Sequence, residues 1–353
     1  MYPTVKINLP RIKDNAQCIV SLAERNGISI WGVTKGVSAD LQIAKTLLDA
    51  GVEGLADSRI KNLKKLSDLE TKLMLLRSPM SSQVDEVVTY ADISLNSEIS
   101  IIKALNKAAK EQTKRHKIIL MIDLGDRREG ILPEQSLDTI KEVKALSNIN
   151  LIGLGTNLAC FMGILPTIDK MKELKQIKKK IDESFALDLT IISGGNSSSL
   201  PLLLNDDYQA EINQLRVGET ILLGREVPSG DEFPGTVTNT FNLVAEVIEV
   251  KKKPTSTQGQ QGENAFGERK DIIDKGTRRR AILALGKQDI APTGLRPCNN
   301  KVIIEGASSD HLIVDVTNLK EVRVGTKLAF KMDYPCLLRA MTSPYLDREY
   351  IKD

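Results

Sequence analysis

A single lysine directly follows a short apolar stretch near the start of the chain. Residues 30–34 read Ile-Trp-Gly-Val-Thr and lead into Lys35 and Gly36. Continuous apolar and β-branched residues of this kind are typical of a strand buried on both faces. A lysine desolvated at the carboxyl end of such a strand can form an imine with a carbonyl compound. The alternative is a lysine whose ammonium extends from the strand end into solvent.

A second chemical feature is the run Ser-Gly-Gly-Asn-Ser-Ser-Ser at residues 193–199. Two glycines allow the backbone to approach an anion, and hydroxyl and amide groups at a helix start complete a phosphate site. Barrel enzymes often bind phosphate after their seventh and eighth strands. The run alone also fits an ordinary loop that caps a helix. Its predicted position beside an eighth strand favours the phosphate site.

Short apolar runs alternate with amphipathic stretches from about residue 10 to residue 225. Eight candidate strands cover residues 29–34, 52–56, 72–77, 91–95, 117–123, 150–155, 189–193 and 219–223. Candidate helices lie between them at residues 41–50, 59–69, 98–110, 133–146 and 168–185. Eight strand–helix units predict a closed (β/α)8 barrel of the TIM type, with its chemistry on the loops that follow the strands.

The sequence changes character after Pro228. Residues 237–250, 280–285, 302–304, 312–316 and 327–332 form short β-branched runs separated by turn residues. This pattern predicts a C-terminal all-β domain. Residues 255–269 are rich in Gly, Gln, Ser and Glu, and are expected to form a mobile loop. The predicted domains are a barrel at 10–228 and a β domain at 229–353.

Composition excludes several classes of function. A net charge of +3 is too small to indicate nucleic-acid binding, and no apolar run approaches the ~18 residues of a membrane helix. The four cysteines are widely spaced, which indicates reduced thiols and a cytoplasmic protein. With only two histidines, His116 and His311, a histidine-rich metal site is not expected.

Several stretches together resemble one enzyme family. They are residues 33–35, 57–59, 123–130, 193–199, 215–219 and 307–316. They are similar to the alanine racemase group of barrel-type pyridoxal phosphate enzymes, and within it to the ornithine and lysine racemases. The resemblance covers essentially the whole chain. It implies pyridoxal 5′-phosphate as the cofactor, and it implies that an N-terminal strand within residues 1–9 joins the β domain.

The resemblance also implies roles for individual residues. Lys35 would bind the cofactor covalently and serve as one of two racemising bases. Arg216 takes the place of the arginine that hydrogen bonds to the pyridine nitrogen and limits side reactions. The remaining cofactor-binding candidates are Asn196, Ser197, Gly218, Glu219 and Tyr334. Tyr334 could instead serve only packing in the β domain, and Arg216, like Arg128, could be a surface arginine.

The chain departs from alanine racemase on the substrate side. Arg128 matches the arginine beside the substrate carboxylate, but Met121 replaces the lysine that is carbamylated in many alanine racemases. Arg128 therefore needs another partner, for which Asp126 is a candidate. The family tyrosine after the cofactor lysine is Ala39, and the histidine after the sixth strand is Asn157, a substrate-binding candidate.

The chain also departs from the family at the second catalytic base. The family tyrosine that follows a glycine early in the β domain is replaced by Lys287, after Gly286. Lys287 could act as the second base if it is buried, or it could be a solvated lysine.

The missing tyrosine and histidine predict a roomier substrate pocket that suits ornithine or lysine. A distal ammonium needs an acidic partner, and Asp310, beside Ser309, lies in a stretch that matches the family's β domain. Asp310 could instead serve only to order its own loop.

The resemblance therefore implies a racemase of a basic amino acid that forms a head-to-tail homodimer, as members of the family do. The β domain of one subunit would cover the barrel mouth of its partner. A D-amino acid aldolase or lyase of the same architecture is an alternative, although such enzymes usually need a divalent metal. A non-catalytic cofactor carrier is the other alternative, although carriers of this kind lack a β domain.

Overall fold

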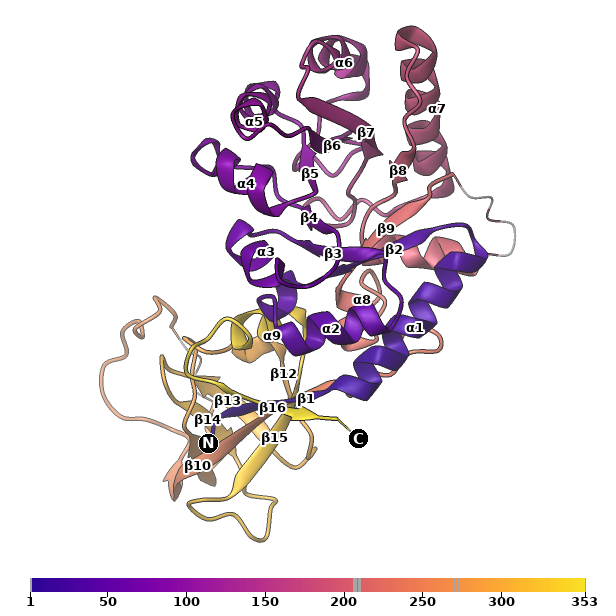
Figure 1. The fold of residues 1–353 in the computed structure, drawn as a ribbon. Coiled ribbons are helices and arrows are strands. Elements are labelled where there is room, and N and C mark those ends of the chain that lie inside the picture. Colours follow the sequence, from indigo (N-terminus) through magenta and orange to yellow (C-terminus); the bar gives the residue numbers. More distant parts are fainter. Residues whose placement is uncertain (1, 206–207, 209–210, 270, 272, 353) are drawn as a thin grey trace. The chain divides into compact units, whose positions relative to one another are not determined.

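The computed structural model describes residues 2–205, 208, 211–269, 271 and 273–352. The chain separates into two compact units. One unit consists of Leu9–Thr238, and the other combines Met1–Asn8 with Asn239–Asp353. Figure 1 shows helices and parallel strands in the first unit and mainly β structure in the second.

The first unit contains a closed barrel of eight parallel strands (Figure 1). The strands are β2 (Ser29–Val33), β3 (Gly54–Asp57), β4 (Leu73–Leu75), β5 (Ile93–Asn96), β6 (His116–Met121), β7 (Ile149–Gly155), β8 (Ile191–Ser193) and β9 (Gln214–Val217). Parallel pairing of β9 with β2 closes the barrel. The predicted fold class is therefore confirmed.

The predicted eighth strand was misplaced. Residues 219–223 form the short helix α8 (Glu219–Leu223), and the eighth strand is Gln214–Val217. Short apolar runs do not distinguish a strand from a buried helix, and Arg216 interrupts the apolar pattern of the true strand. Gly224, with a left-handed φ of 66°, ends the helix and marks its boundary.

Helices surround the barrel strands in sequence order. They are α1 (Leu9–Arg25), α2 (Leu41–Asp49), α3 (Ile60–Leu66), α4 (Val84–Tyr90), α5 (Ile99–Glu111), α6 (Ser136–Lys144) and α7 (Ile168–Phe185). Helix α2 shows how local sequence sets a boundary, because the Asp40 carboxylate accepts hydrogen bonds from the amides of Gln42 and Ile43. Its apolar side chains Ile43 and Leu47 are then buried.

Apolar side chains fill the barrel interior. Trp31, Met74, Leu95, Ile119 and Met121 belong to one buried cluster contributed by several strands. The barrel is therefore a packed core and not a pore, so polar chemistry is confined to the strand ends.

The second unit is built around one eight-stranded sheet. Its strands are β1 (Thr4–Asn8), β10 (Phe241–Pro254), β11 (Thr277–Leu283), β12 (Leu295–Pro297), β13 (Ile303–Ala307), β14 (Leu312–Asp315), β15 (Lys327–Met332) and β16 (Asp347–Ile351). The N-terminal strand β1 pairs antiparallel with β10 and parallel with β16. Helix α9 (Tyr334–Ala340) follows β15, and the described residues 255–269 form no helix or strand.

Candidate active site

Lys35 lies two residues after the end of β2, at the start of a short 3-10 turn (η1, Lys35–Val37). Amides of Val37 and Ala39 donate to the carbonyl of Thr34, and Ser38 and Ala39 both have left-handed backbone. Non-glycine residues adopt this conformation only where the surrounding structure imposes it. The backbone of Lys35 is thus held firmly. Its side chain is half-buried, and no carboxylate pairs with it in the part of the chain that the structure describes.

Asp57, at the end of β3, anchors the strand end that carries Lys35. The Thr34 hydroxyl donates to the Asp57 carboxylate at 2.8 Å. The same carboxylate accepts from the Arg59 amide and from the side chain of Asn62. Burial raises the pKa of Asp57, and these hydrogen bonds act in the opposite direction. Asp57 therefore connects the ends of two neighbouring strands.

Replacing Asp57 by alanine should lower the free energy of unfolding by about 2–3 kcal/mol, because buried donors lose their acceptor. Urea denaturation followed by circular dichroism measures this difference. Asp49→Ala, at an exposed position of α2, is the matched control and should change the unfolding free energy by less than about 0.5 kcal/mol. Equal stabilities of the two variants would show that Asp57 does not anchor the strand end.

Arg216 lies on β9 and is 4% exposed. Its guanidinium donates to the Ser193 hydroxyl and, at 2.7 Å, to the carbonyl of Thr156. The Ser193 hydroxyl also lies 2.7 Å from the side-chain oxygen of Gln214. Burial lowers the pKa of Arg216 to about 10, so the guanidinium stays charged at neutral pH. Arg216 is a buried, oriented cation and not a surface arginine.

The Gly/Ser run after β8 packs against the end of β9. The Ser197 hydroxyl accepts from the amides of Gly218 and Thr220 at 3.3 and 3.4 Å. A Cβ at Gly218 would lie 3.0 Å from the Cβ of Val33, so the end of β9 closely approaches the end of β2. The structure thus brings Ser197 and Gly218 close to the strand that leads to Lys35. Glu219 follows as the first residue of α8.

Asn196 connects the loops after β7 and β8. Its side-chain amide donates to Asn157 Oδ1 at 3.0 Å and to the Leu158 carbonyl at 2.9 Å. Two buried polar atoms nearby, Thr156 Oγ1 and Asn157 Nδ2, have no partner among the described residues. Buried polar groups rarely lack a partner, so these atoms indicate a polar ligand at this end of the barrel.

Arg128 lies in the loop after β6, and its guanidinium pairs with the adjacent Glu129 and contacts Cys160 Sγ. The prediction that Asp126 pairs with Arg128 is wrong. Its carboxylate instead accepts from the amides of Cys160, Phe161 and Met162, which holds the loop after β7. Burial acts to lower the pKa of Arg128, but pairing with Glu129 outweighs it and raises the pKa.

The structure also groups the candidates in the second unit. The Lys287 amide donates to Ser308 O at 2.8 Å, and the next amide donates to Ser309 O at 3.0 Å. Lys287, Ser309 and Asp310 therefore occupy two adjoining turns. The Asp310 side chain is 61% exposed, and its Oδ1 lies 2.7 Å from His311 Nδ1. Tyr334 is half-buried at the first position of α9.

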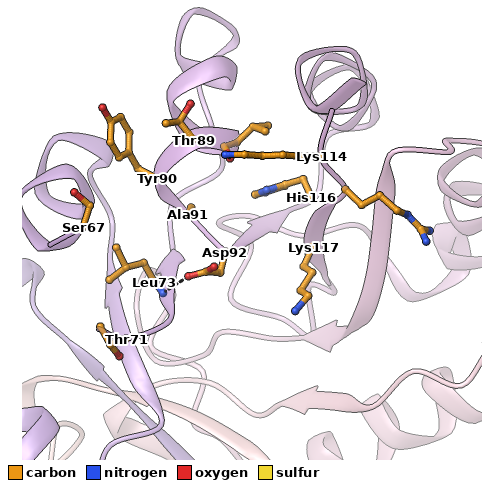
Figure 2. A pocket seen from close by; sticks show the side chains of 12 residues that line it. Ser67, Thr71, Leu73, Thr89, Tyr90, Ala91, Asp92, Lys114, His116 and Lys117 are labelled. Carbon is orange, nitrogen blue, oxygen red and sulfur yellow. Dashed lines mark hydrogen bonds between the residues drawn. The ribbon is translucent and has the colours of Figure 1, made fainter. Parts of the chain in front are cut away.

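A separate pocket of about 460 Å³ lies at the amino ends of β4, β5 and β6 (Figure 2). Lys35, in contrast, follows the carboxyl end of β2. Asp92 accepts a hydrogen bond from the Leu73 amide at 2.8 Å, and Lys114 donates to the Val88 carbonyl. Burial lowers the pKa of His116 to about 4, so its ring is neutral. These polar groups serve contacts within the chain, so this pocket is not the candidate site.

Among residues 2–205, 208, 211–269, 271 and 273–352, no three His, Cys, Asp or Glu side chains gather to hold a metal ion. Of the helices that the structure describes, none is long and apolar enough to cross a bilayer. All four cysteines are free thiols.

Sequence comparisons place the chain among racemases. Residues 7–226 match the family described as alanine racemase, N-terminal domain. Ornithine racemase of Acetoanaerobium sticklandii is 45% identical, and the match covers 99% of this chain and 100% of that protein. Lysine racemase of Thermotoga maritima is 42% identical, with 99% of both chains covered.

Structural comparisons agree on the fold. Alanine racemase from Clostridium difficile 630 superposes with a TM-score of 0.76 at 21% identity, covering 100% of this chain and 97% of the other. A D-threo-3-hydroxyaspartate dehydratase variant superposes at 0.70 and 14% identity, covering 99% and 92% of the two chains. At these identities the structures establish the fold alone, whereas the sequence matches span the chain. The chain therefore belongs to the alanine racemase family and is an amino acid racemase that uses pyridoxal 5′-phosphate.

Proposed function

We propose that this enzyme interconverts the L and D forms of a basic amino acid, ornithine or lysine, by proton transfer at Cα with two bases. The observation that carries the substrate class is the full-length similarity to an ornithine racemase and a lysine racemase at 45% and 42% identity. The alanine racemases matched by sequence share less identity with this chain, at 23–27%.

The residues at the carboxyl ends of the barrel strands fit pyridoxal phosphate. The unpartnered Thr156 Oγ1 and Asn157 Nδ2 offer hydrogen-bonding groups to a polar ligand. Lys35 would bind the cofactor covalently and Arg216 would donate to the ring nitrogen, and the phosphate-binding candidates are Asn196, Ser197, Gly218, Glu219 and Tyr334. When bound, the cofactor withdraws electrons from the substrate and acidifies its Cα proton.

The remaining chemistry falls to side chains of the enzyme. Lys35 and Lys287 are the proposed bases, one for each face of the substrate: one removes the Cα proton and the other supplies a proton to the opposite face. Lys287 lies in the β unit, and we infer a head-to-tail homodimer in which Lys287 serves the barrel of the partner subunit. Gel filtration with light scattering tests the dimer.

Arg128 and Asn157 are the proposed contacts of the substrate in the barrel unit. Arg128 presents a charged guanidinium at the loop after β6, next to the loop of Asn157 after β7, and it contacts Cys160 of that loop. Charged guanidinium groups suit the binding of a carboxylate. Since Glu129 already pairs with Arg128, we expect Glu129 to orient the guanidinium.

A chiral-chromatography panel tests the proposed activity. Incubation of the enzyme and cofactor with L-ornithine, L-lysine, L-arginine, L-alanine or L-serine should yield the D isomer fastest for ornithine or lysine. Release of ammonia or an aldehyde without a D isomer would instead indicate a lyase. Alanine as the best substrate would overturn the proposed preference for a cation.

Substrate choice should depend on Asp310, with Ser309 beside it. The Asp310 carboxylate contacts His311 through Oδ1 and is otherwise largely exposed, so we expect it to pair with a distal ammonium. A charge-assisted hydrogen bond of this kind contributes roughly 1.5–3 kcal/mol. Asp310→Asn should therefore lower kcat/KM for ornithine by about one to two orders of magnitude and leave the value for alanine nearly unchanged.

Steady-state kinetics with both substrates checks this expectation. Glu321→Gln, at an exposed position of the same unit, is the matched control and should leave both values unchanged. Equal losses on ornithine and alanine would assign Asp310 a role in the structure of its loop, beside His311.

A further inference from the structure

The irregular segment between β10 and β11 contains an ordered turn at residues 264–268. The side-chain oxygen of Asn264 accepts from the amides of Phe266 and Glu268 at 2.9 and 3.0 Å. The Asn264 amide donates to the Glu268 carbonyl at 2.9 Å, and its side-chain nitrogen donates to Glu268 Oε2 at 3.0 Å. The turn therefore fixes the direction of the Glu268 carboxylate.

This turn encloses the head of Lys287. The Lys287 ammonium donates to both carboxylate oxygens of Glu268, at 2.9 and 3.0 Å. It also lies 3.8 Å from the centroid of the Phe266 ring. The Lys287 side chain is 20% exposed and that of Glu268 is 54% exposed, so the lysine is the more enclosed partner. A carboxylate and an aromatic face are the two groups that hold an alkylammonium.

Other elements hold the Lys287 backbone. Its amide donates to the Ser308 carbonyl at 2.8 Å, and its carbonyl accepts from Arg339 of α9 at 2.9 Å. A Cβ at Gly286 would lie 2.3 Å from Ser309 O, so the backbones of the two turns are in contact. Since the backbone is held, only the flexible four-carbon side chain of Lys287 remains to be oriented by other contacts.

We propose that Glu268, with Phe266, is a positioning residue that holds the Lys287 ammonium in place for proton transfer. This inference rests on the proposed function, in which Lys287 is the second base. A lysine whose head is held in one orientation loses less entropy when its nitrogen reaches the reacting carbon. Because Glu268 is half exposed, its ion pair with Lys287 should add little to the free energy of unfolding. We therefore expect the ion pair to orient the lysine side chain.

The first test uses the full-length protein without cofactor and measures the geometry directly. Limited acetylation with acetic anhydride, read by peptide mass spectrometry, reports how available each lysine is. In Glu268→Gln, acetylation of Lys287 should be roughly two- to fivefold faster than in the wild type. Glu263→Gln, an exposed carboxylate of the same segment, is the matched control and should change nothing.

The second test separates positioning from a general structural effect. In D2O, the cofactor-loaded enzyme exchanges the Cα proton of each enantiomer, and each base serves one of them. Glu268→Gln should slow exchange of the enantiomer served by Lys287 by about tenfold, and exchange of the other by less than about twofold. Glu268→Asp, which keeps the charge, should recover part of the rate.

The effect should also depend on Lys287 itself. In a Lys287→Gln background, adding Glu268→Gln should cause no further loss of racemisation, since the two changes act on one contact. Phe266→Leu should slow the same enantiomer by about twofold to fivefold, as expected for an exposed cation–π contact.

The outcomes distinguish this inference from the proposed function. If the wild type racemises no amino acid and exchanges neither enantiomer, the proposed function fails. If the wild type racemises but Glu268→Gln exchanges both enantiomers at wild-type rates, the positioning role fails while the function stands. Equal slowing of both enantiomers, or unchanged acetylation of Lys287, would also overturn the positioning role.

Discussion

Lys35→Ala should abolish racemisation, lowering kcat/KM by about four orders of magnitude or more, because the proposed covalent attachment of the cofactor and one proposed proton transfer would be lost together. The protein should still fold. The backbone on both sides of Lys35 is fixed by the carbonyl of Thr34 and by the left-handed residues Ser38 and Ala39, which the substitution leaves in place. The half-buried ammonium pairs with no carboxylate in the described residues, so its removal leaves no buried partner charge behind.

Two measurements check this prediction. Chiral chromatography follows the D isomer, and titration with pyridoxal phosphate follows the visible absorbance of the covalently bound cofactor. The variant should lose both signals and keep the wild-type melting temperature without cofactor. Lys45→Ala, an exposed lysine of α2, is the matched control and should keep both signals. A variant of Lys35 that keeps the visible band would rule out Lys35 as the attachment site.

The position of Lys35 at a strand end could be predicted from sequence because a parallel barrel has a regular sequence pattern. Buried parallel strands are continuous apolar runs, and side chains that follow them must gather at one end. Residues 29–34 show such a run, and strand β2 ends one residue earlier, at Val33. The run 193–199 after β8 follows the same logic, and its Ser197 does meet the amide of Gly218.

The eighth strand could not be predicted from the apolar pattern. Arg216 is a buried charge on a strand. The free-energy cost of burying it is offset by hydrogen bonds to groups that are distant in sequence. Those partners are the Thr156 carbonyl and the Ser193 hydroxyl, on or next to two other strands. The apolar pattern does not reveal these contacts. Residues 219–223, which are more apolar than the true strand at 214–217, were therefore predicted as the strand although they form helix α8.

The ion-pair partners of the candidate residues Arg128 and Lys287 could not be predicted from sequence for a related reason. Asp126 lies two residues before Arg128 and Glu129 lies one residue after it. Only the fold decides that the Asp126 carboxylate accepts from the amides of residues 160–162 and that Glu129 pairs with Arg128. Glu268 meets Lys287 across a segment whose composition predicted a mobile loop. Contacts made by irregular segments depend on turns such as that of Asn264, which have no periodic signature.

Arg216→Glu should slow racemisation by about a hundredfold or more and raise transamination, the side reaction in which the amino group stays on the cofactor. Arg216 is a buried cation whose pKa, lowered by burial to about 10, keeps it charged at neutral pH. As a charged donor it can hydrogen bond to a ring nitrogen, but it disfavours a second positive charge there. A carboxylate at this position would favour a protonated ring, which withdraws electrons more strongly and allows protonation at the wrong carbon.

The substitution also tests the fold, so a second variant is needed. A glutamate at this position would face the Thr156 carbonyl, an acceptor that currently receives a hydrogen bond at 2.7 Å. Two buried acceptors that face each other without a donor should lower the free energy of unfolding by about 1–3 kcal/mol. Arg216→Gln keeps a neutral donor, and we expect it to slow racemisation without raising transamination.

Chiral chromatography and detection of the 2-oxo acid product measure the two reactions in each variant, with melting temperature as a control for folding. The ratio of transamination to racemisation is the decisive quantity, because loss of folded protein lowers both rates and leaves their ratio unchanged. A raised ratio in Arg216→Glu and an unchanged ratio in Arg216→Gln would place the charge of residue 216 at the ring nitrogen. If a folded Arg216→Glu variant keeps wild-type rates and clean products, Arg216 serves only to join Thr156 and Ser193 within the barrel.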